Sequence, residues 1–101
     1  MKLKDLKRGQ IIELRWEYWD HVKDGFQPRV IHMVLLHRND NPNFIPPKKA
    51  RGWDAKVIYD SNPKETGESK IPYDNTYYDT WLNMSINENK LTILSDVENE
   101  V

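Results

Sequence analysis

Apolar and polar residues alternate along residues 10–19 with the two-residue period of a β-strand. One face of this predicted strand carries Ile12, Leu14, Trp16 and Tyr18, and the other carries Glu13, Arg15 and Glu17. The sequence Lys23-Asp24-Gly25 follows as a turn signal, because glycine tolerates the positive φ of tight hairpins. Residues 26–38 then read as a second, longer strand. The pattern therefore predicts a β-hairpin at the start of the chain.

At the centre of the second strand, residues 30–36, apolar residues occupy both odd and even positions and therefore both faces. A strand covered on both faces, as in a small closed barrel, has this pattern. Further strands are predicted over residues 53–61 and 90–95, with a short edge strand over residues 70–73. Residues 75–84 favour a short helix because their aromatic residues recur at helical spacing, although strand alternation also fits them.

These elements predict an all-β, or β-rich α+β, fold. We expect a small five-stranded barrel of the SH3-like kind, with one short helix near residues 75–84. An OB-like five-stranded barrel and an α+β roll are the alternatives. The length of 101 residues indicates one domain, which we place at residues 1–95. The acidic residues 96–101 are predicted to be a tail that frays.

Composition narrows the classes of protein that fit. Charged residues make up 31% and hydrophobic residues 38%, which is typical of a soluble globular chain. The 15 basic and 16 acidic residues nearly cancel, which argues against binding to nucleic acid by bulk positive charge. Cysteine is missing from the sequence, so disulfides, thiolate zinc sites and cysteine nucleophiles are excluded.

The charged start of the chain and its short apolar runs predict a cytoplasmic protein without a membrane partner. Asn, Ile, Lys and Tyr, which have AT-rich codons, outnumber Ala, Gly, Pro and Arg by 32 to 17. An AT-rich gene of this kind fits a phage or mobile-element accessory protein that binds and modulates a larger host protein.

Residue patterns for catalysis or metal binding are missing from the sequence. His32 and His37 are five residues apart, so on one continuous strand they point to opposite faces and do not share a metal. The sequence has no G-x-S-x-G elbow, and its four glycines are scattered singly, so they build no phosphate-binding loop. We therefore expect no enzyme activity, no metal and no small-molecule cofactor.

A basic and aromatic segment, residues 44–53, is the first candidate binding site. It contains the stiff pair Pro46-Pro47, then Lys48, Lys49, Arg51 and Trp53. Such cations can hold phosphates while the indole ring stacks on a base, or they can grip an acidic protein surface. The alternative is a solvated connection whose Trp53 folds back into the core.

Aromatic residues are the second candidate, because the chain has four tryptophans and five tyrosines. These residue types dominate protein-binding hot spots, and Trp19 falls near the predicted hairpin tip. The leading hypothesis is a non-catalytic protein-binding module whose partner contacts include Trp19, Lys48, Lys49, Arg51 and Trp53. The other hypothesis is a small β-barrel that binds nucleic acid through residues 44–53.

Overall fold

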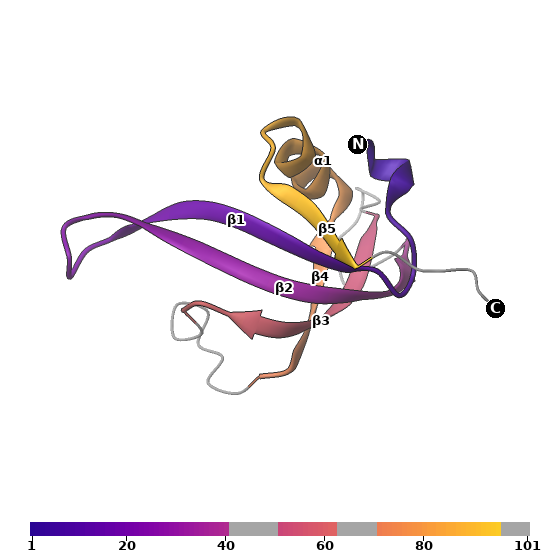
Figure 1. The fold of residues 1–101 in the computed structure, drawn as a ribbon, viewed down its shortest axis with the longest axis horizontal. Coiled ribbons are helices and arrows are strands. Elements are labelled where there is room, and N and C mark those ends of the chain that lie inside the picture. The colour runs from indigo at the N-terminus through magenta and orange to yellow at the C-terminus, as the bar shows by residue number, and fades with distance from the viewer. Residues whose placement is uncertain (41–50, 63–70, 96–101) are drawn as a thin grey trace.

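The computed structural model describes residues 1–40, 51–62 and 71–95 (Figure 1). The chain begins with a 3-10 helix, η1 (Leu3–Asp5), and continues with β1 (Ile11–Asp20), β2 (Gly25–Asn39), β3 (Gly52–Asp60), β4 (Tyr73–Tyr78), α1 (Asp79–Asn87) and β5 (Leu91–Ser95). The strands form an antiparallel sheet in the order β4-β3-β2-β1-β5. None of the helices in these ranges has the length and apolar character that crossing a membrane requires.

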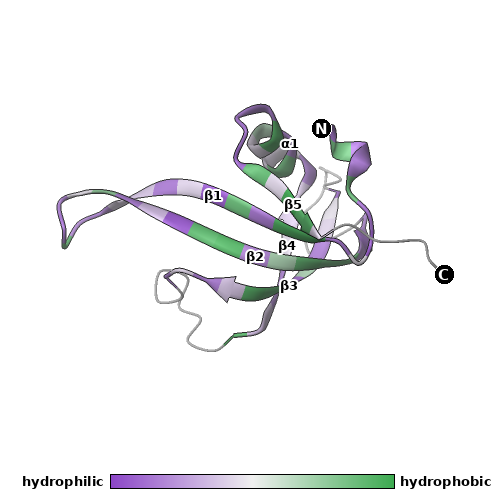
Figure 2. Cartoon of the chain, in the orientation of Figure 1, coloured by the Kyte–Doolittle hydropathy of each residue, from purple (hydrophilic) through white to green (hydrophobic). Residues whose placement is uncertain are grey.

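The predicted hairpin is confirmed as β1 and β2, which pair without a register shift from Ile11↔Val34 to Asp20↔Gly25. Apolar and polar residues alternate along β1, whereas the centre of β2 carries apolar residues at successive positions, as the bands of Figure 2 show. The turn differs in one detail from its prediction, because the positive φ of 53° belongs to Asp24 rather than to Gly25. The Asp20 side chain shapes this turn by accepting hydrogen bonds from the backbone N–H of Val22 at 2.9 Å and of Lys23 at 3.2 Å.

The hydrophobic core lies between one face of the sheet and α1. Its buried members are Leu6, Ile12, Leu14, Ile31, Met33, Leu35, Trp53, Ala55, Val57, Tyr77, Leu82, Ile86 and Leu91. The strand predicted over residues 53–61 is confirmed as β3, and Trp53, Ala55 and Val57 are buried on its core face, whereas Tyr59 is 47% exposed. A register shift opposite His32 and Met33 inserts one extra residue there, so the strand changes parity and Asp60 becomes buried.

The predicted SH3-like barrel is not confirmed, because the sheet is open. In the described residues, β4 and β5 are its two edges and do not pair with each other. The prediction relied on apolar residues at both parities of β2. Ile31, Met33 and Leu35 are fully buried, but Val34 and Leu36 of the other parity are only half-buried. Aliphatic residues are also found on half-exposed faces of sheets, so their presence on both faces of β2 does not require the sheet to close into a barrel.

The predicted helix is confirmed as an element, but its position was wrong. It spans Asp79–Asn87 instead of residues 75–84, and residues 75–78 belong to β4. Tyr77 pairs with Trp53 and Tyr78 with Gly52 in the sheet, so pairing with β3 decides the state of this ambiguous segment. The chain then turns at Asn89, which has a φ of 59°, and enters β5.

Candidate partner-binding hairpin

The outer half of the β1–β2 hairpin extends beyond the rest of the sheet (Figure 1). Pairing of β1 with β5 reaches only Leu14, and pairing of β2 with β3 reaches only Ile31. We call residues 16–29 the arm. Among the described residues, its strands form ladder pairs only with each other. At the usual rise of a β-strand, the arm reaches about 17 Å from the body of the sheet.

Three apolar side chains at the end of the arm, Trp19, Val22 and Phe26, form what we call the apolar tip. Trp19 and Phe26 lie directly opposite each other, with ring centroids 5.3 Å apart in an edge-to-face arrangement at 84°. Trp19 is 44% exposed, Phe26 65% and Val22 95%. A two-stranded ribbon is marginally stable in water, and an aromatic pair of this geometry adds about 0.5–1.5 kcal/mol to it. The tip therefore stabilises the hairpin and still leaves a large apolar surface open.

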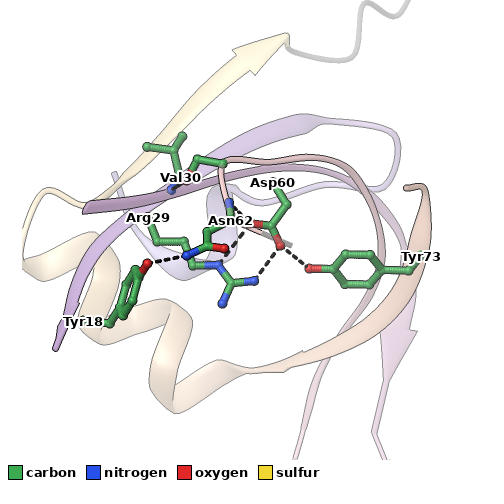
Figure 3. A network of polar contacts seen from close by, with 7 residues as sticks. Tyr18, Arg29, Val30, Asp60, Asn62 and Tyr73 are labelled. Carbon is green, nitrogen blue, oxygen red and sulfur yellow. Dashed lines mark hydrogen bonds and ion pairs between the residues drawn. The ribbon is translucent and has the colours of Figure 1, made fainter. Parts of the chain in front are cut away.

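A buried polar cluster holds the base of the arm to β3 and β4 (Figure 3). The Arg29 guanidinium donates from Nε to Asp60 Oδ1 at 3.1 Å and from a terminal nitrogen to Asp60 Oδ2 at 2.5 Å. The Tyr73 hydroxyl and the Asn62 backbone N–H also donate to Asp60, each at 2.9 Å. The Asn62 side chain in turn donates to the Tyr18 hydroxyl on the arm. We call these five residues the anchor network.

Both charges of the anchor network are held in their ionised form. The Arg29 side chain is 6% exposed and that of Asp60 is 0% exposed. Burial by itself raises the pKa of Asp60, but the hydrogen bonds from Arg29, Asn62 and Tyr73 outweigh it, and the pKa lies below the ordinary value. Burial likewise lowers the pKa of Arg29, and its pairing with Asp60 reverses this and raises it. The pair is a charged, bidentate contact between β2 and β3.

Aromatic contacts connect the same base to α1. Arg29 lies 5.4 Å from the ring centroid of Trp16, which packs edge-to-face on Trp81 at 5.5 Å. Trp81 in turn stacks on Tyr77, also at 5.5 Å. Because the arm is fixed by both an ion pair and packed rings, its apolar tip is presented in a defined direction rather than on a loose loop.

The structure separates the residues that the sequence grouped into one site. Trp19 is exposed on the arm as expected, but Trp53 is 6% exposed and belongs to the core. Its ring is therefore unavailable for stacking on a base, and Arg38 lies over it at 5.4 Å. The Arg51 side chain is 70% exposed, with its Nε 3.9 Å from Asp40. Lys48 and Lys49 fall outside the described residues.

Two of the three histidines pair with carboxylates on the sheet. His32 Nε2 lies 2.8 Å from Glu13, and His37 Nε2 lies 2.9 Å from Asp54. The pKa of Glu13 is lowered by its hydrogen bond from Arg15, and that of Asp54 by its hydrogen bond from Thr76. Within residues 1–40, 51–62 and 71–95, no three such side chains come together as a metal site would require.

Sequence reasoning missed Val22 and Phe26 as members of the tip. Phe26 lies opposite Trp19 because the turn is centred between residues 22 and 23, and the turn signal at residues 23–25 did not specify this register. The anchor network left no local signal either, since Arg29 and Asp60 are 31 residues apart in the chain. No family model, curated protein or solved structure matches this chain.

Proposed function

We propose that this protein is a non-catalytic binding module that docks on a larger protein through the apolar tip. The observation that carries the proposal is the exposure of Trp19, Val22 and Phe26 at the end of an anchored, projecting arm. Tryptophan and other large apolar residues supply most of the energy of protein interfaces when they enter a pocket of the partner. An exposed apolar group on a rigid element loses little conformational entropy on binding.

The charges of the arm favour a protein partner over nucleic acid. Glu17, Asp20 and Asp24 are acidic, and Arg29 is neutralised by Asp60. Lys23 is the one other lysine or arginine of residues 16–29. Phosphates would be repelled by this distribution, whereas an apolar pocket with a basic rim would complement it.

Nucleic-acid binding through residues 44–53 is the second hypothesis, and the burial of Trp53 gives it less support. The two hypotheses differ in their response to salt. Binding through Lys48, Lys49 and Arg51 predicts an affinity for DNA or RNA that falls steeply with ionic strength. Docking through the apolar tip predicts weak salt dependence and no measurable affinity for either polymer.

The test begins with capture of binding proteins from cells that carry this gene. Wild-type protein, Trp19→Ala, Phe26→Ala and the control Tyr59→Ala are immobilised in parallel. Tyr59 is a fair control because it is 47% exposed but lies on β3, away from the arm. The captured protein is then purified and titrated by calorimetry.

We expect each tip substitution to weaken the purified complex about 30-fold or more, which is the loss typical of a hot-spot residue. The Tyr59→Ala protein is expected to bind like wild type. Equal affinities for all four proteins would contradict docking through the tip.

A further inference from the structure

Along one edge of the arm, β1 continues beyond the end of its pairing with β5. The backbone N–H of Arg15 donates to the carbonyl oxygen of Lys90 at 2.9 Å, which is the last contact between β1 and the β5 segment. The Lys90 N–H turns away from β1 and donates to Ser85 in α1. The position beside β1 that β5 occupies is therefore vacant next to residues 16–20 in the part of the chain that the structure describes.

Strand alternation identifies the groups that face this vacancy. Residues two apart on a strand direct their N–H and C=O groups to the same side. Since Arg15 faces the β5 side, Glu17 and Trp19 face it as well, and no register shift interrupts β1–β2 pairing between them. Their N–H and C=O groups have no partner among the described residues.

Two other strand edges, the β2 side of the arm and β4, are less available. Val30 exchanges hydrogen bonds with Ser61 on the β3 side, so Pro28, two residues earlier, turns its nitrogen to that same side and offers no donor. At the β4 edge, the Thr76 N–H already donates to the Asn75 side chain at 2.9 Å. The β1 edge of the arm lacks such a block.

A hollow beside this edge leaves space for an added strand, and the charges around it favour basic residues in that strand. The hollow lies where β5 begins, beside the base of the arm, and both strands of the arm border it. Its lining residues include Trp16, Glu17, Pro28, Arg29, Asn89 and Lys90. Lys90 is paired with Glu88 at 2.9 Å and Arg15 with Glu13 at 2.5 Å, whereas Glu17 has no ion-pair partner in the described ranges. A strand added here would place alternate side chains beside Glu17 on one face and beside Trp16 and Tyr18 on the other.

We propose that this edge accepts an extended segment of the partner protein as an added β-strand, with basic residues beside Glu17 and apolar residues beside Trp16 and Tyr18. The inference rests on the proposed function, since it names the second contact that the arm makes. Main-chain hydrogen bonds would give the added strand its register, and the alternating side chains would give specificity. A second copy of this chain fits less well, because the seam would bring Glu17 and Asp20 of both copies together.

The probe is a capped eight-residue peptide that alternates lysine with valine. Two controls accompany it: a peptide with glutamate in place of lysine, and one with the same charge in which two valines are replaced by proline. Amide exchange of isotopically labelled protein is followed by NMR. At saturation with the Lys-Val peptide, we expect the Glu17 and Trp19 amides to exchange about tenfold more slowly. The acidic and proline peptides are expected to leave these amides unprotected.

Two variants separate the backbone contact from the side chain. Glu17→Pro removes the N–H that faces the vacancy and keeps the β1–β2 ladder, whereas Glu17→Ala keeps the N–H and removes only the charge. We expect Glu17→Pro to abolish protection at position 19. Glu17→Ala should weaken peptide binding roughly five- to tenfold and retain the protection pattern. Tryptophan fluorescence confirms that each variant is folded, and Glu17→Ala alone suffices if the proline variant is not.

Three results would overturn the proposal: no slowing of exchange at positions 17 and 19, equal slowing by the proline peptide, or slowing without peptide that grows with protein concentration. The last result would show that a second copy occupies the edge. These outcomes are separate from those of the proposed function, which depends on Trp19→Ala and Phe26→Ala. Loss of binding in the tip variants without protection at the edge would reject only the added strand.

Discussion

Replacing Asp60 by asparagine removes one charge from the anchor network and keeps the size of the side chain. The change leaves the Arg29 guanidinium in a site where its side chain is 6% exposed, without the negative charge of Asp60. The amide oxygen of asparagine can still accept a hydrogen bond from Arg29 or Tyr73, but it carries no negative charge. The perturbation therefore tests whether the ion pair holds the base of the arm.

Removing one partner of a buried ion pair costs about 3–5 kcal/mol. Because hydrogen-bond acceptors survive in Asp60→Asn, we expect a cost of about 3 kcal/mol, near the lower limit. With a urea dependence of about 1.5 kcal/mol/M, the unfolding midpoint falls by about 2 M. Urea titration followed by tryptophan fluorescence measures this shift, and amide exchange in the arm should accelerate with it.

The double variant Arg29→Met/Asp60→Leu is the control. Replacing both charges by apolar side chains removes the buried guanidinium together with the carboxylate, so most of the lost stability should return. A residual cost of about 1–2 kcal/mol remains because Tyr73 and the Asn62 N–H lose their acceptor. A loss of less than about 1 kcal/mol in Asp60→Asn would refute the reasoning. It would mean that water solvates the two charges and that the pair contributes no more than a surface ion pair.

Three further predictions concern stability. Gly52→Ala should cost about 1–3 kcal/mol in urea unfolding because its Cβ would lie 2.5 Å from a backbone oxygen of β4, whereas Gly25→Ala, with 4.0 Å of clearance, should change little. The free energy of unfolding, measured over an acid titration, should decrease as pH falls below about 4. The pKa of Asp60 is lower in the folded state than in the unfolded state, so its contribution to stability is complete only above the unfolded-state pKa. If the stability of Asp60→Asn fell with pH as steeply as that of wild type, this prediction would be contradicted. Trp53→Ala should cost about 3–5 kcal/mol and Trp19→Ala about 1 kcal/mol, and a reversed order would mean that the buried and exposed rings are wrongly assigned.

The hairpin was predictable because its information is local. A two-residue period with one apolar face determines which residues of β1 point inward, and the turn signal at residues 23–25 shows that a second strand follows. The exact register with β2 came from the structure. A core position for Trp53 was the alternative that the sequence left open, and the structure supports it. Its basic neighbours Lys48, Lys49 and Arg51 instead led to the interpretation of an exposed ring, although a strand can carry a buried ring directly beside a charged loop.

The rest depended on contacts between distant residues. The extra residue in β3 that exposes Tyr59 and buries Asp60 is set by pairing with β2, and no local pattern reports it. Residues 75–78 form a strand because they pair with the edge of β3. The Arg29–Asp60 ion pair depends on the register between β2 and β3, so composition and spacing along the sequence could not predict it.

The most direct test is hydroxyl-radical footprinting of the captured complex, read by mass spectrometry, with Trp19 and Phe26 compared against Tyr59. Insertion of the arm into the partner predicts that oxidation of Trp19 and Phe26 falls on complex formation while Tyr59 stays as reactive as in the free protein. Unchanged oxidation of both arm residues, with protection appearing at Tyr59 instead, would show that the partner sits on a different surface.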